Sequence, residues 1–309
     1  MAIAQPITQV RRPRMFGASR RARSEARWGY LLIAPMMIGF TVFFLFALVA
    51  SLVLSLTSWD VLSSPVWVGL DNYKRLFSDD RFISALKNTV LITVPNVILR
   101  MIFSLGLAIA LNTDIRFRSF YRMIFFLPVI TMPVAIGTIW KWLYDPAFGP
   151  VNAFLGGLGL PQPEWLSNPS TAVAAVVIVL LWSGVGYDMI IFLAGLQSIP
   201  REYYEAAEID GAGSWRQFRD ITLPLLTPTT FFLMVIAIIS SLQIFDLVYI
   251  MTRFGTSNRL PTIVYYVYDE GFRNFRMGYA ITMAWALLVI ILVFTLLQFL
   301  LQRRWVHYA

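Results

Sequence analysis

Two groups of residues in this sequence have types and spacing that could carry function. The first is a hydrophilic segment, residues 205–224, which reads EAAEIDGAGSWRQFRDITLP and lies between two long apolar runs. The second consists of polar residues inside apolar runs, above all Arg100 and Asp188. The first group is typical of an element that docks onto another protein. The second predicts a polar path or an ion pair inside a membrane.

The residue inventory limits the chemistry of the chain. There is no cysteine, and the single histidine is His307. We therefore expect no disulfide, no thiolate or histidine metal site and no Ser-His-Asp triad. No G-x-x-x-x-G-K-[ST] sequence occurs, so the chain lacks that loop for holding ATP phosphates. The expectation is a protein that is not an enzyme and holds no metal or cofactor of its own.

Arg100 lies near the middle of the second apolar run and Asp188 near the middle of the fourth. A charge at the centre of a span costs ~2.5–3.5 kcal/mol on insertion scales, so neither side chain should face lipid. Two interpretations remain open. The residues have a structural role, either as an ion pair or with each bonded to a carbonyl or amide in the bundle, or they line a translocation cavity. Asn96, one helical turn before Arg100, would extend the same polar face.

A second polar set lies in the fifth apolar run. Gln243 and Asp246 are three residues apart and therefore share a helix face. With Phe245 and Tyr249 they place hydrogen-bonding groups beside aromatic surface, which sugars need for their hydroxyls and ring faces. Hydrogen bonding between helices would explain these residues equally well. Two more candidates for a substrate path are the aromatic residues Trp182 and Tyr187, although packing is the commoner role for such side chains.

The composition indicates that membrane-spanning helices position these residues. The chain is 58% hydrophobic and 14% charged, whereas soluble proteins carry about 25% charged residues. A bilayer core of ~30 Å requires ~20 apolar residues in a helix. We predict an all-α membrane protein with about six transmembrane helices. The predicted spans are residues 29–56, 86–111, 119–142, 171–196, 227–251 and 279–302.

The distribution of Lys and Arg predicts that both termini are cytoplasmic, because cytoplasmic segments carry an excess of positive charge. Four arginines, Arg253, Arg259, Arg273 and Arg276, oppose this orientation, but longer outer segments translocate despite charge. We divide the chain into a basic tail (1–28), a transmembrane domain (29–302) with a cytoplasmic loop (197–226), and a short tail (303–309). The basic tail fits anionic lipid better than nucleic acid. Its arginines are Arg11, Arg12, Arg14, Arg20, Arg21, Arg23 and Arg27.

Local rules predict a helix, a glycine turn and a second helix within the cytoplasmic loop. Residues 201–209 favour a helix, which Ser198 would cap with Pro200 in its first turn. Gly211 would then supply the turn, because glycine accepts backbone angles that other residues resist. Ser214 and Gln217 have the spacing of a capping box for the second helix, and Pro224 would end it. Such a projection suits a groove on a partner protein.

The spacing within this loop resembles a known signature. Glu205-Ala206-Ala207, three residues, Gly211, nine residues and Ile221-x-Leu223-Pro224 match the EAA loop of membrane subunits of bacterial ABC importers at every fixed position. In that family the loop is the coupling helix that binds an ATPase subunit. The resemblance implies that the following residues dock the ATPase: Tyr203, Tyr204, Glu205, Ala206, Ala207, Asp210, Gly211 and Pro224.

Short strings elsewhere resemble the carbohydrate-importing branch, which includes the maltose and glycerol-3-phosphate systems. Their order along one chain is more specific than any one of them. One segment departs from the family: residues 253–259 read RFGTSNR where a Gly-Gly-Pro-like turn is common. The matching strings are Gly69–Tyr73, Tyr121-Arg122, Leu127-Pro128, Leu196–Pro200, Leu242–Asp246 and Gly278–Ala280.

The resemblance implies a type I ABC importer permease fold in the bacterial inner membrane. The implied function is a permease subunit of an ATP-driven, binding-protein-dependent importer that moves a sugar or related polyol by alternating access. Expected partners are a second, related permease, two nucleotide-binding ATPase subunits that hold ATP and Mg, an extracytoplasmic solute-binding protein and the lipid bilayer, but no nucleic acid. The alternative is an ion-coupled secondary transporter that uses Arg100 and Asp188, although no inverted repeat is visible.

Overall fold

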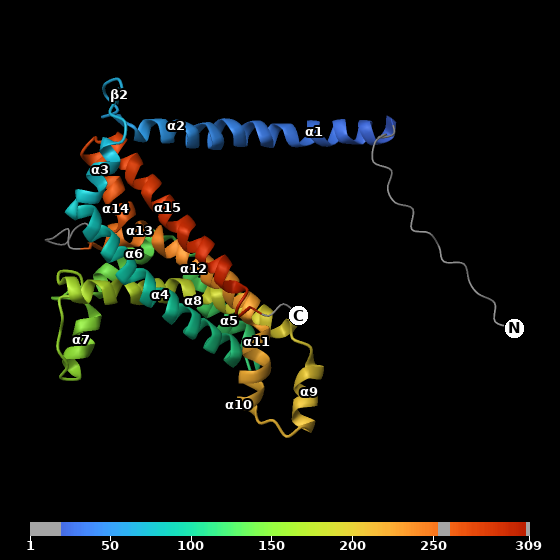
Figure 1. Cartoon of the computed structure of the whole chain (residues 1–309). Helices are drawn as coiled ribbons and strands as arrows, with labels where there is room; N and C mark the ends of the chain where they lie inside the picture. Colours follow the sequence, from blue (N-terminus) through green and yellow to red (C-terminus); the bar gives the residue numbers. More distant parts are fainter. Residues whose placement is uncertain (1–19, 253–259, 307–309) are drawn as a thin grey trace. The chain divides into compact units, whose positions relative to one another are not determined.

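The computed structural model describes residues 20–252 and 260–306, and most of them are helical (Figure 1). Contacts within the chain separate two units, Met1–Val53 and Leu54–Ala309. Two segments lie outside the described residues: residues 253–259, which depart from the family pattern, and the start of the basic tail. The two units are described separately below.

The first unit contains the first predicted span. Helix α1 (Arg20–Phe40), a π-helical turn η1 (Thr41–Leu45) and helix α2 (Phe46–Ser55) follow one another directly. The stretch Ser24–Ser55 is long and apolar enough to cross a membrane, and none of its most apolar window is buried within the chain. The helix begins at Arg20, earlier than predicted, because Arg, Ala and Glu in residues 20–28 all favour helix.

Three long helices of the second unit agree with predicted spans. They are α4 (Asp80–Asn112), α8 (Pro169–Ser198) and α15 (Met277–Gln302). Helix α4 begins earlier than predicted because the Asp79 carboxylate accepts hydrogen bonds from the backbone amides of Arg81 and Phe82. Helices α4 and α8 pack against each other more extensively than any other pair of elements.

Two predicted continuous spans are broken in the structure. Residues 119–142 form α5 (Arg118–Phe126), a 3-10 turn η2 (Leu127–Ile130) and α6 (Pro133–Leu143), with a bend of 98°. Pro133 has no amide hydrogen and forces the preceding residue into an extended conformation, which explains this break. Residues 227–251 form α12 (Thr227–Leu242) and α13 (Asp246–Thr252), separated by a short non-helical stretch.

The number of spans depends on how bent helices are counted. Four helices in the described part of the chain are long and apolar enough to cross a membrane. The number rises to six if each of two bent pairs is one span. These pairs are Arg118–Ile130 with Pro133–Leu143, and Ser214–Leu225 with Thr227–Leu242, the second bent by 61°. The prediction of about six spans therefore holds when each bent pair counts as one span, and these two spans are not straight.

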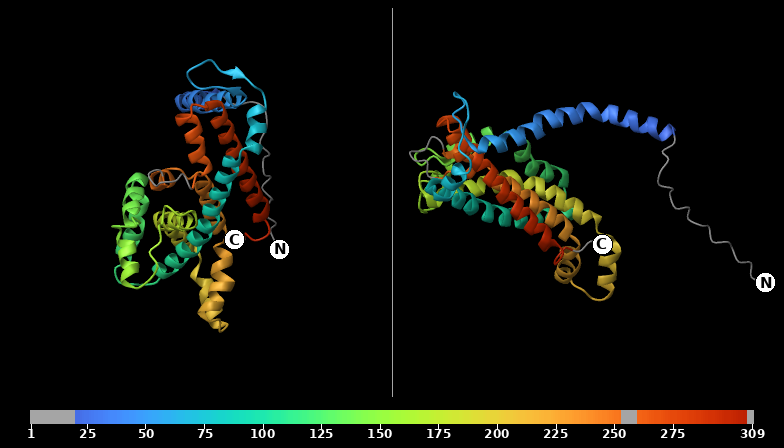
Figure 2. Two further views of the ribbon diagram at one scale, coloured as in Figure 1. Left: turned by 90° about the vertical axis from the view of Figure 1, so that its left-hand side faces the viewer. Right: turned by 45° about the horizontal axis from the view of Figure 1, so that its top comes forward.

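Short elements cover the two ends of the second unit. Strands β1 (Thr57–Ser58) and β2 (Val66–Trp67) form a small antiparallel ribbon beside α3 (Asp71–Ser78). Helix α7 (Pro150–Gly157) lies between α6 and α8, and α14 (Ile263–Tyr268) with a π-helical turn η4 (Asp269–Arg273) precedes α15. Figure 1 and the two further views in Figure 2 show α3 and α14 at the end opposite to α9 and α10.

Within the described residues, the core of the second unit consists of three apolar clusters that α4 connects. Phe82 and Ala85 belong to a cluster with α14 and α15, and Ile92 belongs to one with α8 and α13. Ala108 and Leu111 belong to a third cluster, packed against the last turns of α8 and the start of α12. This helix therefore fixes the spacing between the two functional regions described below.

Candidate functional site: a helical hairpin and a polar cavity

The EAA segment forms a helical hairpin. Helix α9 (Arg201–Ile209) and a second helical stretch, made of α10 (Ser214–Gln217), η3 (Phe218–Thr222) and α11 (Leu223–Leu225), are joined by a turn at Gly211. Gly211 has a φ of +75°, which favours glycine. The amide of Ala212 donates to the carbonyl of Ala207 at 2.8 Å and closes the end of α9. The predicted glycine turn is confirmed.

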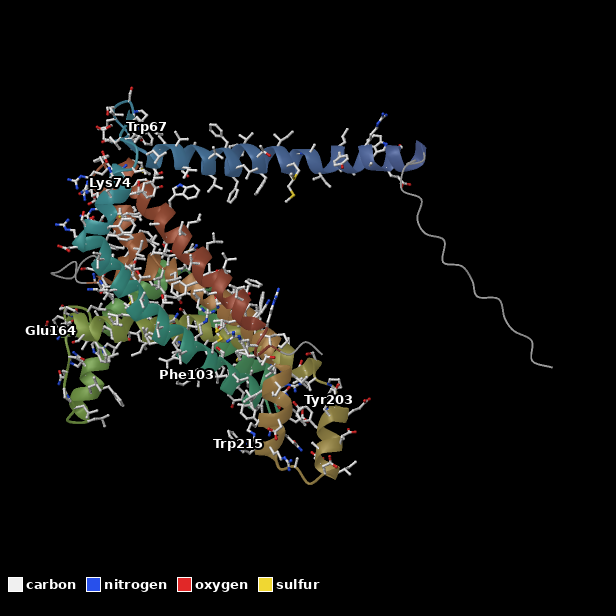
Figure 3. The ribbon with its side chains drawn as sticks, in the orientation of Figure 1. Trp67, Lys74, Phe103, Glu164, Tyr203 and Trp215 are labelled. Atoms are coloured by element: carbon white, nitrogen blue, oxygen red, sulfur yellow. The ribbon has the colours of Figure 1, made fainter. Side chains whose placement is uncertain are left out.

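Side-chain hydrogen bonds hold the two arms of the hairpin together. The hydroxyls of Tyr204 and Thr222 are 2.9 Å apart, and the Gln217 amide donates to the carbonyl of Ala212 at 3.2 Å. Tyr204 is half-buried, and its hydrogen bond to Thr222 helps to position the hairpin. Tyr203, on the neighbouring position of α9, is 50% exposed and is labelled in Figure 3.

Most of the predicted docking residues lie on the exposed part of the hairpin. Glu205, Ala206, Asp210 and Gly211 are exposed, and Ala207 is half-buried. Two apolar residues of the hairpin were not predicted. Ile209 is 88% exposed, and Trp215, which is labelled in Figure 3, is 72% exposed. The sequence could have indicated Ile209 and Trp215, because both are large apolar residues in an otherwise hydrophilic segment.

Two predicted helix caps in this loop are wrong. Ser198 is the last residue of α8 and donates its hydroxyl to the carbonyl of Gly195, so the cap position before α9 falls to Pro200. Gly213, not Ser214, occupies the cap position of α10, and Gln217 bonds back to the turn instead. Pro224 lies inside the last helical turn, and the bend toward α12 follows it at Leu226.

A polar cavity lies in the middle of the second unit, where α4, α8, α12 and the start of α13 meet. It has a volume of about 270 Å³. Five predicted substrate-path residues line it: Asn96, Arg100, Gln243, Phe245 and Asp246. The other residues that line it are Pro133, Leu180, Ser183, Gly184, Ser240, Ser241, Ile244 and Leu247.

The interruption between α12 and α13 creates the polar wall of this cavity. Residues 243–245 leave the helix, so Gln243 is exposed rather than packed against a neighbour. The carbonyl of Ile244 accepts a hydrogen bond from the Thr262 hydroxyl at 3.1 Å. Irregular backbone at membrane depth is tolerated where such partners and a cavity satisfy its polar groups. The break therefore supplies both the space and the hydrogen-bonding groups.

Arg100 and Asp188 form an ion pair between α4 and α8. Arg100 Nη2 donates to Asp188 Oδ1 at 2.7 Å, and Arg100 Nε faces Asp188 Oδ2. The side chain of Asp188 is 1% exposed and that of Arg100 is 12% exposed. The ion pair of the first interpretation is therefore present, and Arg100 also lines the cavity of the second interpretation.

The remaining predicted residues lie around the cavity without lining it. Tyr249 stacks on Phe245, with ring centroids 5.0 Å apart. Trp182 packs edge-on against Trp140 at 5.7 Å, and Tyr187 is partly exposed on α8. The hydroxyl of Ser241 accepts a hydrogen bond from Asn96 at 2.8 Å. Ser183, Ser240 and Ser241 were missed, although hydroxyl side chains inside apolar runs are the signal that marks them.

Comparisons with known proteins agree with the family that the sequence resembles. Residues 89–307 match the family described as binding-protein-dependent transport system inner membrane component. The probable ABC transporter permease protein YesP of Bacillus subtilis is 39% identical over 296 residues, which cover 94% of this chain and 95% of that protein. The sn-glycerol-3-phosphate transport system permease protein UgpA of Agrobacterium fabrum is 34% identical over 282 residues, covering 91% and 96%.

The fold has a counterpart among solved structures. A chain in the crystal structure of a bacterial alginate ABC transporter, in complex with an alginate pentasaccharide-bound periplasmic protein, superposes with a TM-score of 0.81. That chain is 25% identical, and the similarity covers 92% of this chain and 96% of that one. The relatives are permease subunits, which are not catalytic, and ATP hydrolysis belongs to a partner. This chain belongs to the family of inner-membrane components of binding-protein-dependent ABC transport systems.

Proposed function

We propose that this chain forms one half of the translocation path of an importer for a sugar or a related polyol. The observation that carries the proposal is the cavity at the break between α12 and α13. It combines the ring of Phe245 with the exposed polar groups of Gln243 and Asp246. Sugars need both kinds of surface. The glycerol-3-phosphate and alginate transporters among the relatives agree with this class of substrate.

The helical hairpin is the docking element in this proposal. The exposed Tyr203, Ile209 and Trp215 belong to this hairpin, whose helices α9 and α10 lie at the end of the second unit opposite to α3 and α14 (Figure 1). A groove on an ATPase subunit would bury these side chains, in the manner of a helix in a groove. With both termini cytoplasmic, the hairpin faces the cytoplasm. ATP binding then draws two docked hairpins together and opens the path outward, and hydrolysis reverses the change.

The path needs a second wall. The cavity is open at the surface of the single chain, so a second, related permease would enclose it, and an external solute-binding protein would deliver the substrate. The ion-coupled alternative would use Arg100 and Asp188 as the coupling site and would need no ATPase. Membership of a binding-protein-dependent ABC family argues against that alternative.

Affinity purification from membranes in a mild detergent tests the proposal, with co-purifying proteins identified by mass spectrometry. Wild type is compared with a Glu205→Ala/Gly211→Val double variant. We expect an ATPase with a phosphate-binding loop and a second permease with wild type, and loss of the ATPase alone with the variant. A chain that purifies by itself in both forms would favour the ion-coupled transporter.

A further inference from the structure

Five aromatic rings form a connected series that begins at the cavity and ends at the molecular surface. Phe245 stacks on Tyr249 at 5.0 Å and contacts Tyr268 at 5.2 Å. Tyr249 contacts Tyr265 at 5.4 Å and Tyr268 at 5.2 Å. Tyr268 in turn stacks on Phe272 at 5.4 Å, with ring planes 27° apart. Each ring therefore touches the next one along the series.

The exposure of these rings differs from that of an ordinary packed core. Phe245 lines the cavity, and Tyr249 and Tyr268 are half-buried. Phe272 is 62% exposed at the far end, whereas Tyr265 is 2% exposed and contacts Tyr249. The four residues other than Tyr265 thus keep some exposed surface, which a ligand could contact.

The backbone places the rings in this order for two reasons. The break after α12 puts Phe245 immediately before α13, at the edge of the cavity. The π-helical turn η4 then follows α14 and carries Phe272 onto Tyr268. Single π-helical turns inside helices occur frequently at functional sites. Both irregular elements therefore serve to line up aromatic side chains.

Polar groups flank the series at both ends. Gln243 and Asp246 lie beside Phe245 at the cavity. Arg273 Nη1 donates to Asp269 at 3.0 Å in the turn that carries Phe272, and the Arg273 side chain is 49% exposed. Aromatic faces beside planar hydrogen-bonding groups are the surface that a pyranose ring matches, with apolar C–H faces and equatorial hydroxyls.

We propose that Phe272, Tyr268 and Phe245 form an aromatic path on which sugar rings stack in turn between the outer surface and the cavity. The inference rests on the proposed sugar-import function and extends it to residues outside the cavity. Phe272 receives the ring first, Tyr268 accepts it at the middle of the path, and Phe245 delivers it to the polar wall at Gln243 and Asp246.

Leucine substitutions test the path, because leucine keeps apolar bulk but removes the aromatic face. The assembled complex is reconstituted in liposomes with its solute-binding protein, and uptake of radiolabelled maltotriose, cellotriose and an alginate trisaccharide is measured. We expect Tyr268→Leu and Phe272→Leu to lower the rate of uptake of the transported sugar about three- to tenfold, which is the size of an aromatic stacking contribution.

Three controls separate stacking from structural damage. Tyr268→Phe and Phe272→Tyr keep the ring and should retain wild-type rates. Phe154→Leu changes an exposed aromatic residue of α7, 69% exposed and outside the series, and should have no effect. Leucine variants that transport at the wild-type rate would overturn the path while leaving the proposed function intact. A wild-type chain that purifies without an ATPase and without a second permease would remove the aromatic path and the proposed function together.

Cysteine labelling separates a sugar path from a protein contact at Phe272. The chain contains no cysteine, so Phe272→Cys creates the only thiol in this subunit. We expect the rate of maleimide labelling to fall when the transported sugar is added at high concentration without the solute-binding protein. Protection by the sugar-free binding protein, with no effect of the sugar, would assign Phe272 to a protein interface and overturn the proposal.

Discussion

Gly184 and Arg100 occupy complementary space between α8 and α4. A Cβ atom on residue 184 would lie 2.8 Å from Arg100 Cζ and 2.9 Å from both Nε and Nη1. Gly184 is four residues before Asp188, so one face of α8 provides both the gap for the guanidinium and the carboxylate that pairs with it. The missing side chain at residue 184 therefore allows Arg100 to reach Asp188.

Gly184→Ala should displace the guanidinium and weaken the ion pair. Overpacking of this kind typically costs about 1–3 kcal/mol, and we expect a lower melting temperature of the purified complex and slower uptake. Gly106→Ala on α4 is the matched control, because no atom lies within 4 Å of a Cβ at that position. Equal melting temperatures for the two variants would contradict the role assigned to Gly184.

Removal of one charge of the pair should harm assembly more than removal of both. Asp188→Asn leaves Arg100 charged within the bundle, which costs about 3–5 kcal/mol in buried pairs. The double variant Arg100→Gln/Asp188→Asn should recover much of the yield of assembled complex, measured by size-exclusion chromatography. A double variant that assembles but does not transport would show that Arg100 also acts in the path, whereas a yield below that of Asp188→Asn would argue against a simple ion pair.

The amino-acid sequence predicts the features that depend on composition and on backbone preference. Long apolar runs identify α4, α8 and α15, and the position of Gly211 predicts the turn with positive φ. The cost of a lone charge in lipid predicts polar partners for Arg100 and Asp188, but it does not predict that the two residues meet. Each of these inferences rests on a strong physical penalty that few arrangements can avoid.

The breaks in the helices could not be predicted in the same way. Residues 243–245 lie within an apolar run, and their freed carbonyl is satisfied by Thr262, which is distant in sequence. The prediction that Ser214 caps the second helix was wrong for a related reason. Gly213 already has the extended conformation that the cap position requires. Local rules do not contain the tertiary partners that decide such cases.

Asp79 ties the beginning of α4 to α14 and α15. Its carboxylate accepts the hydroxyls of Tyr279 at 2.6 Å and Tyr266 at 2.9 Å. Burial opposes ionisation of Asp79, but hydrogen bonds from Tyr279, Tyr266 and the backbone outweigh it, and the pKa of Asp79 is lowered from the ordinary 3.8. A lowered pKa stabilises the folded state fully above the ordinary value, and the contribution is lost as pH falls through the folded pKa.

Tyr279→Phe should therefore destabilise the complex by about 1 kcal/mol at neutral pH. The difference in melting temperature from wild type should stay constant from about pH 7 to about pH 5 and shrink only below the ordinary pKa of an aspartate. Tyr121→Phe, at a partly exposed tyrosine of α5, serves as the control and should show no such difference. A difference that already disappears between about pH 7 and pH 5 would contradict the assignment to Asp79.

Gly211→Val should abolish uptake without preventing insertion of the chain. Among the described residues, none beyond the two chain neighbours has an atom within 4 Å of a Cβ at residue 211. Any loss must therefore come from the φ of +75° and not from a clash. A β-branched residue resists that conformation, so the turn would open and move Tyr203 and Ile209 away from their docking positions.

Gly213→Val is a stringent control, because Gly213 lies in the same turn, has equally open surroundings and a φ of −70°. It should keep uptake and ATPase binding close to wild type, since valine adopts that backbone conformation readily. Gly211→Asn should retain more activity than Gly211→Val, because asparagine tolerates the left-handed region better than β-branched residues do. If valine at 211 and valine at 213 had the same effect on uptake, the hairpin would depend on the size of the side chain and not on the conformation of Gly211.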